Sequence, residues 1–116
     1  MELTLAILSS LIGRLFPPEE RAAAAALLAG YGGQPGAPEP LRVRVALLKL
    51  SEGNVERLRA LVADAHRDYR DVLAWAEYPT EMASPTWRLS AAEQARIRAV
   101  DREQYLSWLT AHAESR

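Results

Sequence analysis

Charged side chains form two stripes along residues 55–77, a segment with strong helical periodicity. Each residue of a helix advances by about 100°, so Asp64, Asp68 and Asp71 fall on one flank of the apolar stripe. Three carboxylates at this spacing could bind a hard divalent cation such as Mg²⁺ or Mn²⁺, which prefers oxygen ligands. Arg67 can reach Asp64 and Asp71 at helical spacings, and this favours a salt-bridged flank over a metal site.

The other flank carries Arg59 and His66, which are two helical turns apart. This pair resembles the Arg-then-His signature of HEPN-type ribonucleases, small helical bundles that dimerise. The resemblance implies that His66 shuttles a proton and that Arg59 stabilises phosphate charge. Arg59 is followed by Ala60, where that family often has a polar residue, and the rest of the chain gives no second match. A solvated helix flank is the alternative, and it is favoured.

Asp101 lies in the apolar stripe of the last predicted helix, together with Ile97, Tyr105 and Trp108. An unpaired charge at such a position is costly, so we expect Asp101 to have a partner. That partner is either an arginine, with Arg70 as the first choice, or the backbone of a neighbouring segment. The functional alternative is a general acid or base in an aromatic pocket. A structural role is favoured because the sequence offers no nucleophile or second positioned group beside it.

Aromatic side chains are concentrated in the second half of the chain, which holds six of the eight. Trp75 lies off the main apolar stripe, and Tyr78 and Trp87 flank a segment expected to be a loop. Trp75, Tyr78 and Trp87 could therefore form an exposed aromatic surface at a protein interface. The alternative, which is favoured, is that this loop folds back and buries them over the bundle.

Apolar periodicity, prolines, glycines and capping residues predict five helices, at residues 2–15, 18–31, 41–52, 55–77 and 90–112. The segment from Leu41 alternates like a strand, but no partner strand is evident, so a helix is preferred. A Gly/Pro-rich loop is predicted at 31–40 and a polar loop at 78–90. The fold prediction is all-α: one compact domain over 1–116, a bundle of four or five helices with residues 55–77 as its central element.

Composition narrows the possible functions. Cysteine is absent, which excludes disulfides and thiolate metal sites. Lys plus Arg is 14 against 15 for Asp plus Glu, so no overall field favours nucleic acid, and nucleic-acid binding is not expected. The longest apolar run, Ala22–Ala29, is far shorter than the ~20 residues that span a membrane. A secretion signal has basic residues before its apolar stretch, whereas this chain has Glu2 there. A cytoplasmic protein is therefore expected.

Two blocks of sequence, DYRDVLAWAEYP from Asp68 and DREQYLSWL from Asp101, carry a further resemblance. With the stretch from Val43 onward they resemble a family of small bacterial helical proteins of uncharacterised function. The resemblance covers about half of the chain and implies a standalone bacterial protein, without an activity, cofactor or partner.

Phosphate-binding glycine loops, nucleophile elbows and paired-histidine motifs are missing from the sequence, which lowers the expectation of an enzyme. We therefore predict a non-catalytic interaction domain without a cofactor. It binds a protein partner or itself, with a homodimer as the expected state. The alternative is a small HEPN-like ribonuclease or metal-dependent hydrolase that uses the charged flanks of residues 55–77.

Overall fold

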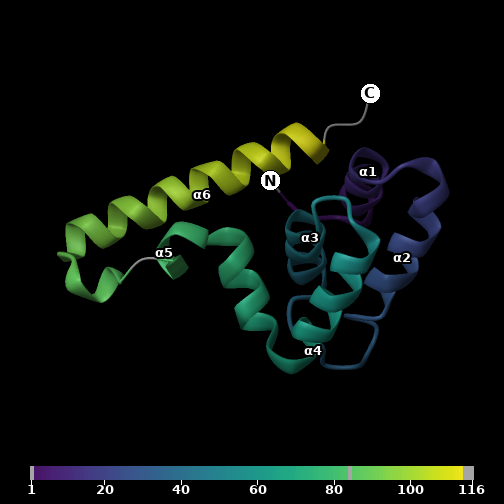
Figure 1. The fold of residues 1–116 in the computed structure, drawn as a ribbon, viewed down its shortest axis with the longest axis horizontal. Helices are drawn as coiled ribbons and strands as arrows, with labels where there is room; N and C mark the ends of the chain where they lie inside the picture. The colour runs from purple at the N-terminus through teal and green to yellow at the C-terminus, as the bar shows by residue number, and fades with distance from the viewer. Residues whose placement is uncertain (1, 84, 114–116) are drawn as a thin grey trace.

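The computed structural model describes residues 2–83 and 85–113 (Figure 1). Over these residues the chain forms six α-helices, two short 3₁₀ helices and no strand, which confirms the all-α prediction. The elements are α1 (Leu5–Leu15), η1 (Pro18–Glu20), α2 (Arg21–Ala29), α3 (Pro40–Ser51), α4 (Val55–Glu77), α5 (Pro79–Ala83), η2 (Thr86–Arg88) and α6 (Ala91–Ala113). The predicted loop at 78–90 is corrected, because it contains α5 and η2. This extra helix α5 makes six rather than four or five.

Helix ends lie close to the residues that favour them. α1 begins after Thr4, whose hydroxyl accepts a hydrogen bond from the Ile7 N–H at 3.2 Å, so the helix starts slightly later than predicted. Pro40 is the first residue of α3, where its missing N–H costs nothing. Asn54 caps α4 by accepting a hydrogen bond from the Arg57 N–H at 2.8 Å. Local capping chemistry therefore sets these boundaries.

The turn between α3 and α4 packs closely against the end of α1. Gly53 in this turn has φ +77°, and a Cβ built on it would lie 2.4 Å from the carbonyl oxygen of Leu15. Both the left-handed backbone and the close approach require glycine. α3 ends at Ser51 with Glu52 as its cap, and Gly53 lets α1 pack against the α3–α4 turn.

α4 is kinked at Asp68, where the backbone is extended, with φ −159° and ψ 101°. The Asp68 carboxylate accepts a hydrogen bond from the Arg70 N–H at 3.0 Å, so it acts as the cap of the second half of the helix. Buried residues continue on both sides of the kink, with Val62 before it and Val72 after it. The apolar periodicity therefore predicts a single helix and does not reveal the kink.

α4, the predicted central element, packs against α2, α3, α5 and α6, and α3 packs against α1 and α4. α3 is the most completely buried of these helices. Four consecutive residues, 45–48, are fully buried, which requires neighbours on every side of the helix. The buried apolar side chains of α3 are Val43, Val45, Ala46, Leu47 and Leu48.

The last three elements, α5, η2 and α6, form what we call the arm. In Figure 1, α6 crosses above the other helices and extends beyond them.

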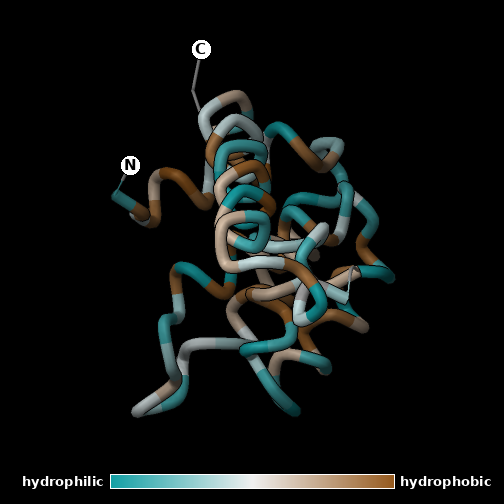
Figure 2. Tube along the Cα trace, turned by 90° about the vertical axis from the view of Figure 1, so that its left-hand side faces the viewer, coloured by the Kyte–Doolittle hydropathy of each residue, from teal (hydrophilic) through white to brown (hydrophobic). Residues whose placement is uncertain are grey.

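The radius of gyration is 14.7 Å, larger than the ~13 Å of a compact domain of this length. Seen from the arm side, hydrophilic and hydrophobic residues alternate along α6 (Figure 2). Among the described residues, no helix is long and apolar enough to cross a membrane.

Candidate functional site

The acidic flank of α4 is a set of local ion pairs. Asp64 pairs with Arg67, three residues away on the helix. Both oxygens of Asp68 accept hydrogen bonds from the Arg70 guanidinium at 3.0 Å, which holds the pKa of Asp68 below its usual value. Asp71 is exposed. Within residues 2–83 and 85–113, no group of three His, Cys, Asp or Glu side chains is arranged to hold a metal ion. The three aspartates therefore do not converge on one site.

Arg59 and His66 also lie apart. The exposed Arg59 side chain pairs with Glu56 at 3.4 Å. The His66 ring lies beside the Tyr31 ring, with 5.6 Å between the ring centroids, and lines an open groove next to the kink. Arg59 is not among the residues that line this groove. The structure thus does not assemble the pair that the ribonuclease resemblance requires.

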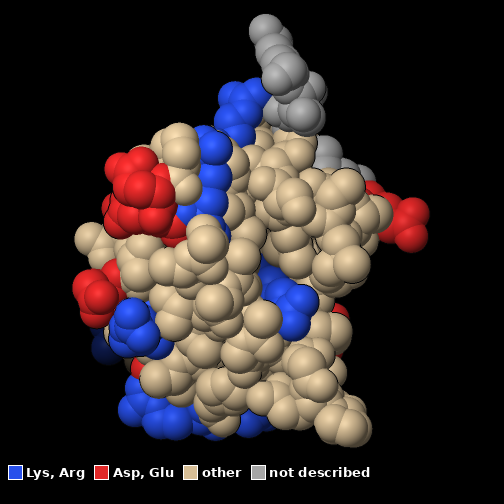
Figure 3. Space-filling view, turned by 90° about the vertical axis from the view of Figure 1, so that its right-hand side faces the viewer, with Lys and Arg blue, Asp and Glu red and all other residues tan. Residues whose placement is uncertain are grey.

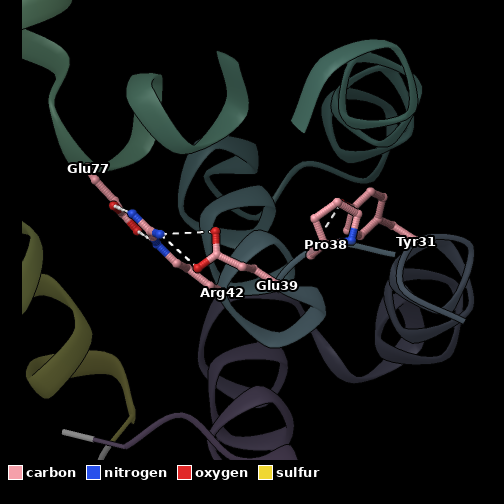
Figure 4. Close-up of polar contacts among 5 residues, drawn as sticks. All are labelled: Tyr31, Pro38, Glu39, Arg42 and Glu77. Atoms are coloured by element: carbon pink, nitrogen blue, oxygen red, sulfur yellow. Dashed lines mark hydrogen bonds and ion pairs between the residues drawn. The ribbon is translucent and has the colours of Figure 1, made fainter. Parts of the chain in front are cut away.

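The Tyr31 side of this groove is held by a hydrogen bond to the loop before α3. The phenol of Tyr31 donates to the carbonyl oxygen of Pro38 at 3.0 Å (Figure 4), and burial raises its pKa. The hydroxyl is therefore a structural donor that ties the loop to α2.

Asp101 is buried, with 1% of its surface exposed, and it caps α5. Its carboxylate accepts hydrogen bonds from the N–H groups of Thr80 at 3.3 Å and Glu81 at 3.0 Å. Pairing with Arg70 is therefore wrong, and the backbone alternative is confirmed. Lys49 also attracts Asp101. Burial lowers the pKa of Lys49, and the negative charge of Asp101 acts against that lowering. Asp101 thus fixes α5 to α6 and is not free to act as an acid or base.

The three predicted interface aromatics differ in exposure. Trp87 is 74% exposed and lies beside the Arg88 guanidinium, 4.6 Å from its ring centroid. Trp75 on α4 is 38% exposed, and Tyr78 is half-buried. The segment after α4 therefore does not fold back over the two tryptophans. Trp108 is also half-buried and stacks on Tyr105.

The described residues include six large apolar side chains that are exposed. They are Leu5, Trp75, Met82, Trp87, Val100 and Leu106. Five of the six lie in the arm or in the last turn of α4, which leads into it. α6 buries three of its 23 residues, so most of its surface is not covered by the rest of the chain. The arm is therefore the part of the molecule with the most uncovered apolar surface.

A cavity of about 180 Å³ lies where α3, the end of α4 and α6 meet. Its lining contains Arg42, Glu77, Tyr78, Arg102 and Tyr105, together with three leucines. These residues are far apart in the sequence and are brought together only when α6 packs on the bundle. Spacing along the chain gives no signal for this cavity, and sequence reasoning missed it.

One wall of the cavity is an ion pair between α3 and α4, in which Glu77 is buried and Arg42 half-buried. Arg42 donates two hydrogen bonds to the Glu77 carboxylate, at 2.8 and 2.6 Å, and a further pair to Glu39 at 3.0 and 3.1 Å (Figure 4). Glu77 is 7% exposed, and its hydrogen bonds raise the pKa of Arg42. Paired in this way, the two charges cancel locally and join α3 to the end of α4.

The other wall carries a polar group without a partner. The Tyr105 hydroxyl is buried, and no hydrogen-bond partner for it exists in the described part of the chain. Burial is the main effect that raises the Tyr105 pKa, and the charge of Glu77 raises it further. The phenol therefore keeps its proton at neutral pH. Arg102 is exposed at the same cavity and makes no ion pair with a described residue. The cavity thus presents two unused hydrogen-bond donors.

Comparison with known proteins finds no matching family model, no similar curated protein and no similar solved structure. The two sequence resemblances stay predictions. We therefore argue function from the residues and contacts of this chain.

Proposed function

We propose that the protein is a self-associating interaction domain that forms a homodimer through its arm. The observation that carries this proposal is the distribution of uncovered apolar side chains, five of six of which lie in or next to the arm. A long helix in water gains most of its stability from packing of an apolar face. α6 buries one narrow stripe, Asp101, Tyr105 and Leu109, so a second copy supplies the contacts that its outer face lacks.

The opposite side of the molecule is a weaker candidate. Figure 3 shows that the surface over α1 and α2 is also poor in charged residues. Its exposed residues on α2 are mostly alanines, Ala22, Ala23, Ala25 and Ala26, which offer little apolar area per side chain. The arm instead exposes tryptophan, methionine, valine and leucine. Aromatic residues and methionine are enriched in protein interfaces, and this favours the arm.

The charges on the outer face of α6 fit a second copy of the same helix. Arg96 and Glu103 are exposed, lie two turns apart on the side opposite the buried stripe, and make no ion pair with described residues. An antiparallel pair of α6 helices, related by a two-fold axis near Ala99 and Val100, sets each Arg96 opposite the partner's Glu103. A two-fold interface must be self-complementary in this way.

The expected affinity is modest. Val100 is 46% and Leu106 37% exposed, so pairing can bury only the remaining exposed part of each side chain. Trp87, which is 74% exposed, has more surface left to bury. Part of this gain is offset by the freedom that two chains lose when they associate.

Light scattering over a wide concentration range tests this proposal. The wild type should pass from monomer to dimer, and Val100→Glu should raise the dissociation constant at least about tenfold, since it places like charges at the two-fold axis. Leu5→Glu is the matched control, because Leu5 is 68% exposed but lies outside the arm. A wild type that stays monomeric up to millimolar concentration overturns the proposal, as does equal weakening by both substitutions.

A further inference from the structure

The cavity between α3, the end of α4 and α6 has the properties of a small-ligand site rather than a packing defect. Its volume, about 180 Å³, is close to the ~150 Å³ of a protein cavity that holds benzene. Leu3, Leu106 and Leu109 form its apolar side. A ligand of this size would have an apolar body with about as many heavy atoms as a benzene ring and a small polar head.

The charges and donors of the cavity indicate the chemistry of that head. Arg42 and Glu77 neutralise each other, so Arg102 is the one uncompensated charge among the residues that line the cavity. Tyr105 is 9% exposed, and its hydroxyl has no acceptor among the described residues. An acceptor that also carries negative charge would satisfy both groups.

From this geometry we propose that the cavity binds a small apolar monocarboxylate. The carboxylate lies between the Arg102 guanidinium at the exposed side and the buried Tyr105 hydroxyl, and both donate to it. The hydrocarbon body packs against the three leucines. The Arg42–Glu77 pair bounds the site without binding the ligand, because all three guanidinium nitrogens of Arg42 already donate to Glu77 or Glu39.

The protonation of Tyr105 supports this assignment. Burial raises its pKa, so at neutral pH the hydroxyl donates its proton and does not compete as an anion. Glu77 raises the same pKa and its partner Arg42 acts against it, so the ion pair offsets part of its own effect on the hydroxyl. Arg102, which has no ion pair with a described residue, orients the ligand's carboxylate.

Titration with sodium benzoate, followed by NMR of the leucine methyl groups, tests the proposal. Benzoate should shift the methyl signals of Leu106 and Leu109 and saturate. Toluene should bind at least about tenfold more weakly, because it lacks the group that both donors recognise.

Three variants separate this site from a cavity that merely holds water. Tyr105→Phe keeps the ring and Arg102→Gln keeps the length, and each should weaken benzoate binding about tenfold or more. Arg96→Gln, on the outer face of the same helix, should leave benzoate binding unchanged although it weakens the dimer. The proposal is overturned if benzoate does not shift the signals, if toluene binds equally well, or if Arg102→Gln binds benzoate like wild type. Arg102 is exposed, so this last variant remains informative even if Tyr105→Phe folds poorly.

Discussion

We expect Asp101→Ala to lower the melting temperature by about 8–12 °C. The carboxylate is buried and accepts two hydrogen bonds from backbone N–H groups of Thr80 and Glu81, at 3.3 and 3.0 Å. Hydrogen bonds to a charged group contribute about 1.5–3 kcal/mol each when isolated, but these two share one cap and are partly buried. We therefore take about 2–3 kcal/mol for both together.

The change in melting temperature is the lost free energy divided by the entropy of unfolding. This entropy is about 2.1 cal/mol/K per residue, or about 0.24 kcal/mol/K for 116 residues. A loss of about 2–3 kcal/mol therefore gives the stated shift of about 8–12 °C. Thermal melts followed by circular dichroism are the assay. Asp71→Ala is the control, because Asp71 is exposed and accepts no hydrogen bond from a described residue. If Asp101→Ala melts within about 2 °C of this control, the cap does not hold the arm in place.

Three further predictions concern the turn after α3, the α3–α4 ion pair and the α5–α6 contact. Gly36→Ala should cost about 1 kcal/mol for its left-handed backbone, and Gly53→Ala at least about twice that, since its Cβ also meets a carbonyl oxygen of α1. Arg42→Met should cost about 2–4 kcal/mol by leaving Glu77 buried without a counter-charge, and adding Glu77→Met should restore most of it. Arg98 on α6 donates to the Glu81 carboxylate on α5 at 2.6 Å, and this hydrogen bond lowers the Glu81 pKa. It therefore stabilises the fold above the ordinary pKa of a glutamate, and this contribution is lost as the pH falls through the lowered value. Glu81→Gln should therefore make the stability of the fold fall less on acidification than it does in the wild type.

Urea denaturation checks the first two of these predictions, and melts at neutral and acidic pH check the third. Equal destabilisation by the two glycine substitutions would contradict the close approach of the turn to α1. A double methionine variant less stable than Arg42→Met would contradict the account of the ion pair. Glu81→Gln with an unchanged loss of stability on acidification would show that the pair does not stabilise the fold.

Local chemistry made most of the helices predictable. Thr4, Pro40 and Asn54 mark helix starts by capping or by a missing N–H, and each effect acts within a few residues. α5 was missed because Pro79 ends α4 and at the same time begins a helix of five residues, too short to show periodicity. The kink at Asp68 was missed because buried residues keep helical spacing on both sides of it.

Tertiary contacts limited what could be predicted about the sites. The burial of Asp101 could be predicted from its place in an apolar stripe, but its partner is the backbone of a helix that the sequence did not reveal. The exposure of Trp87 was one of two alternatives that its place in a connecting segment allowed. Arg42 and Glu77 are 35 residues apart, and only the packing of α3 on α4 brings them together. Their cavity therefore has no signature in the sequence.

The exchange of charges on α6 tests self-association through the arm most directly. Arg96→Glu and Glu103→Arg should each weaken the dimer, because each sets like charges opposite one another across the two-fold axis. Mixing the two single variants should restore a dimer, since opposite charges then face each other in a heterodimer. Light scattering of each variant alone and of the mixture measures this. A mixture as monomeric as its components would contradict the proposed interface.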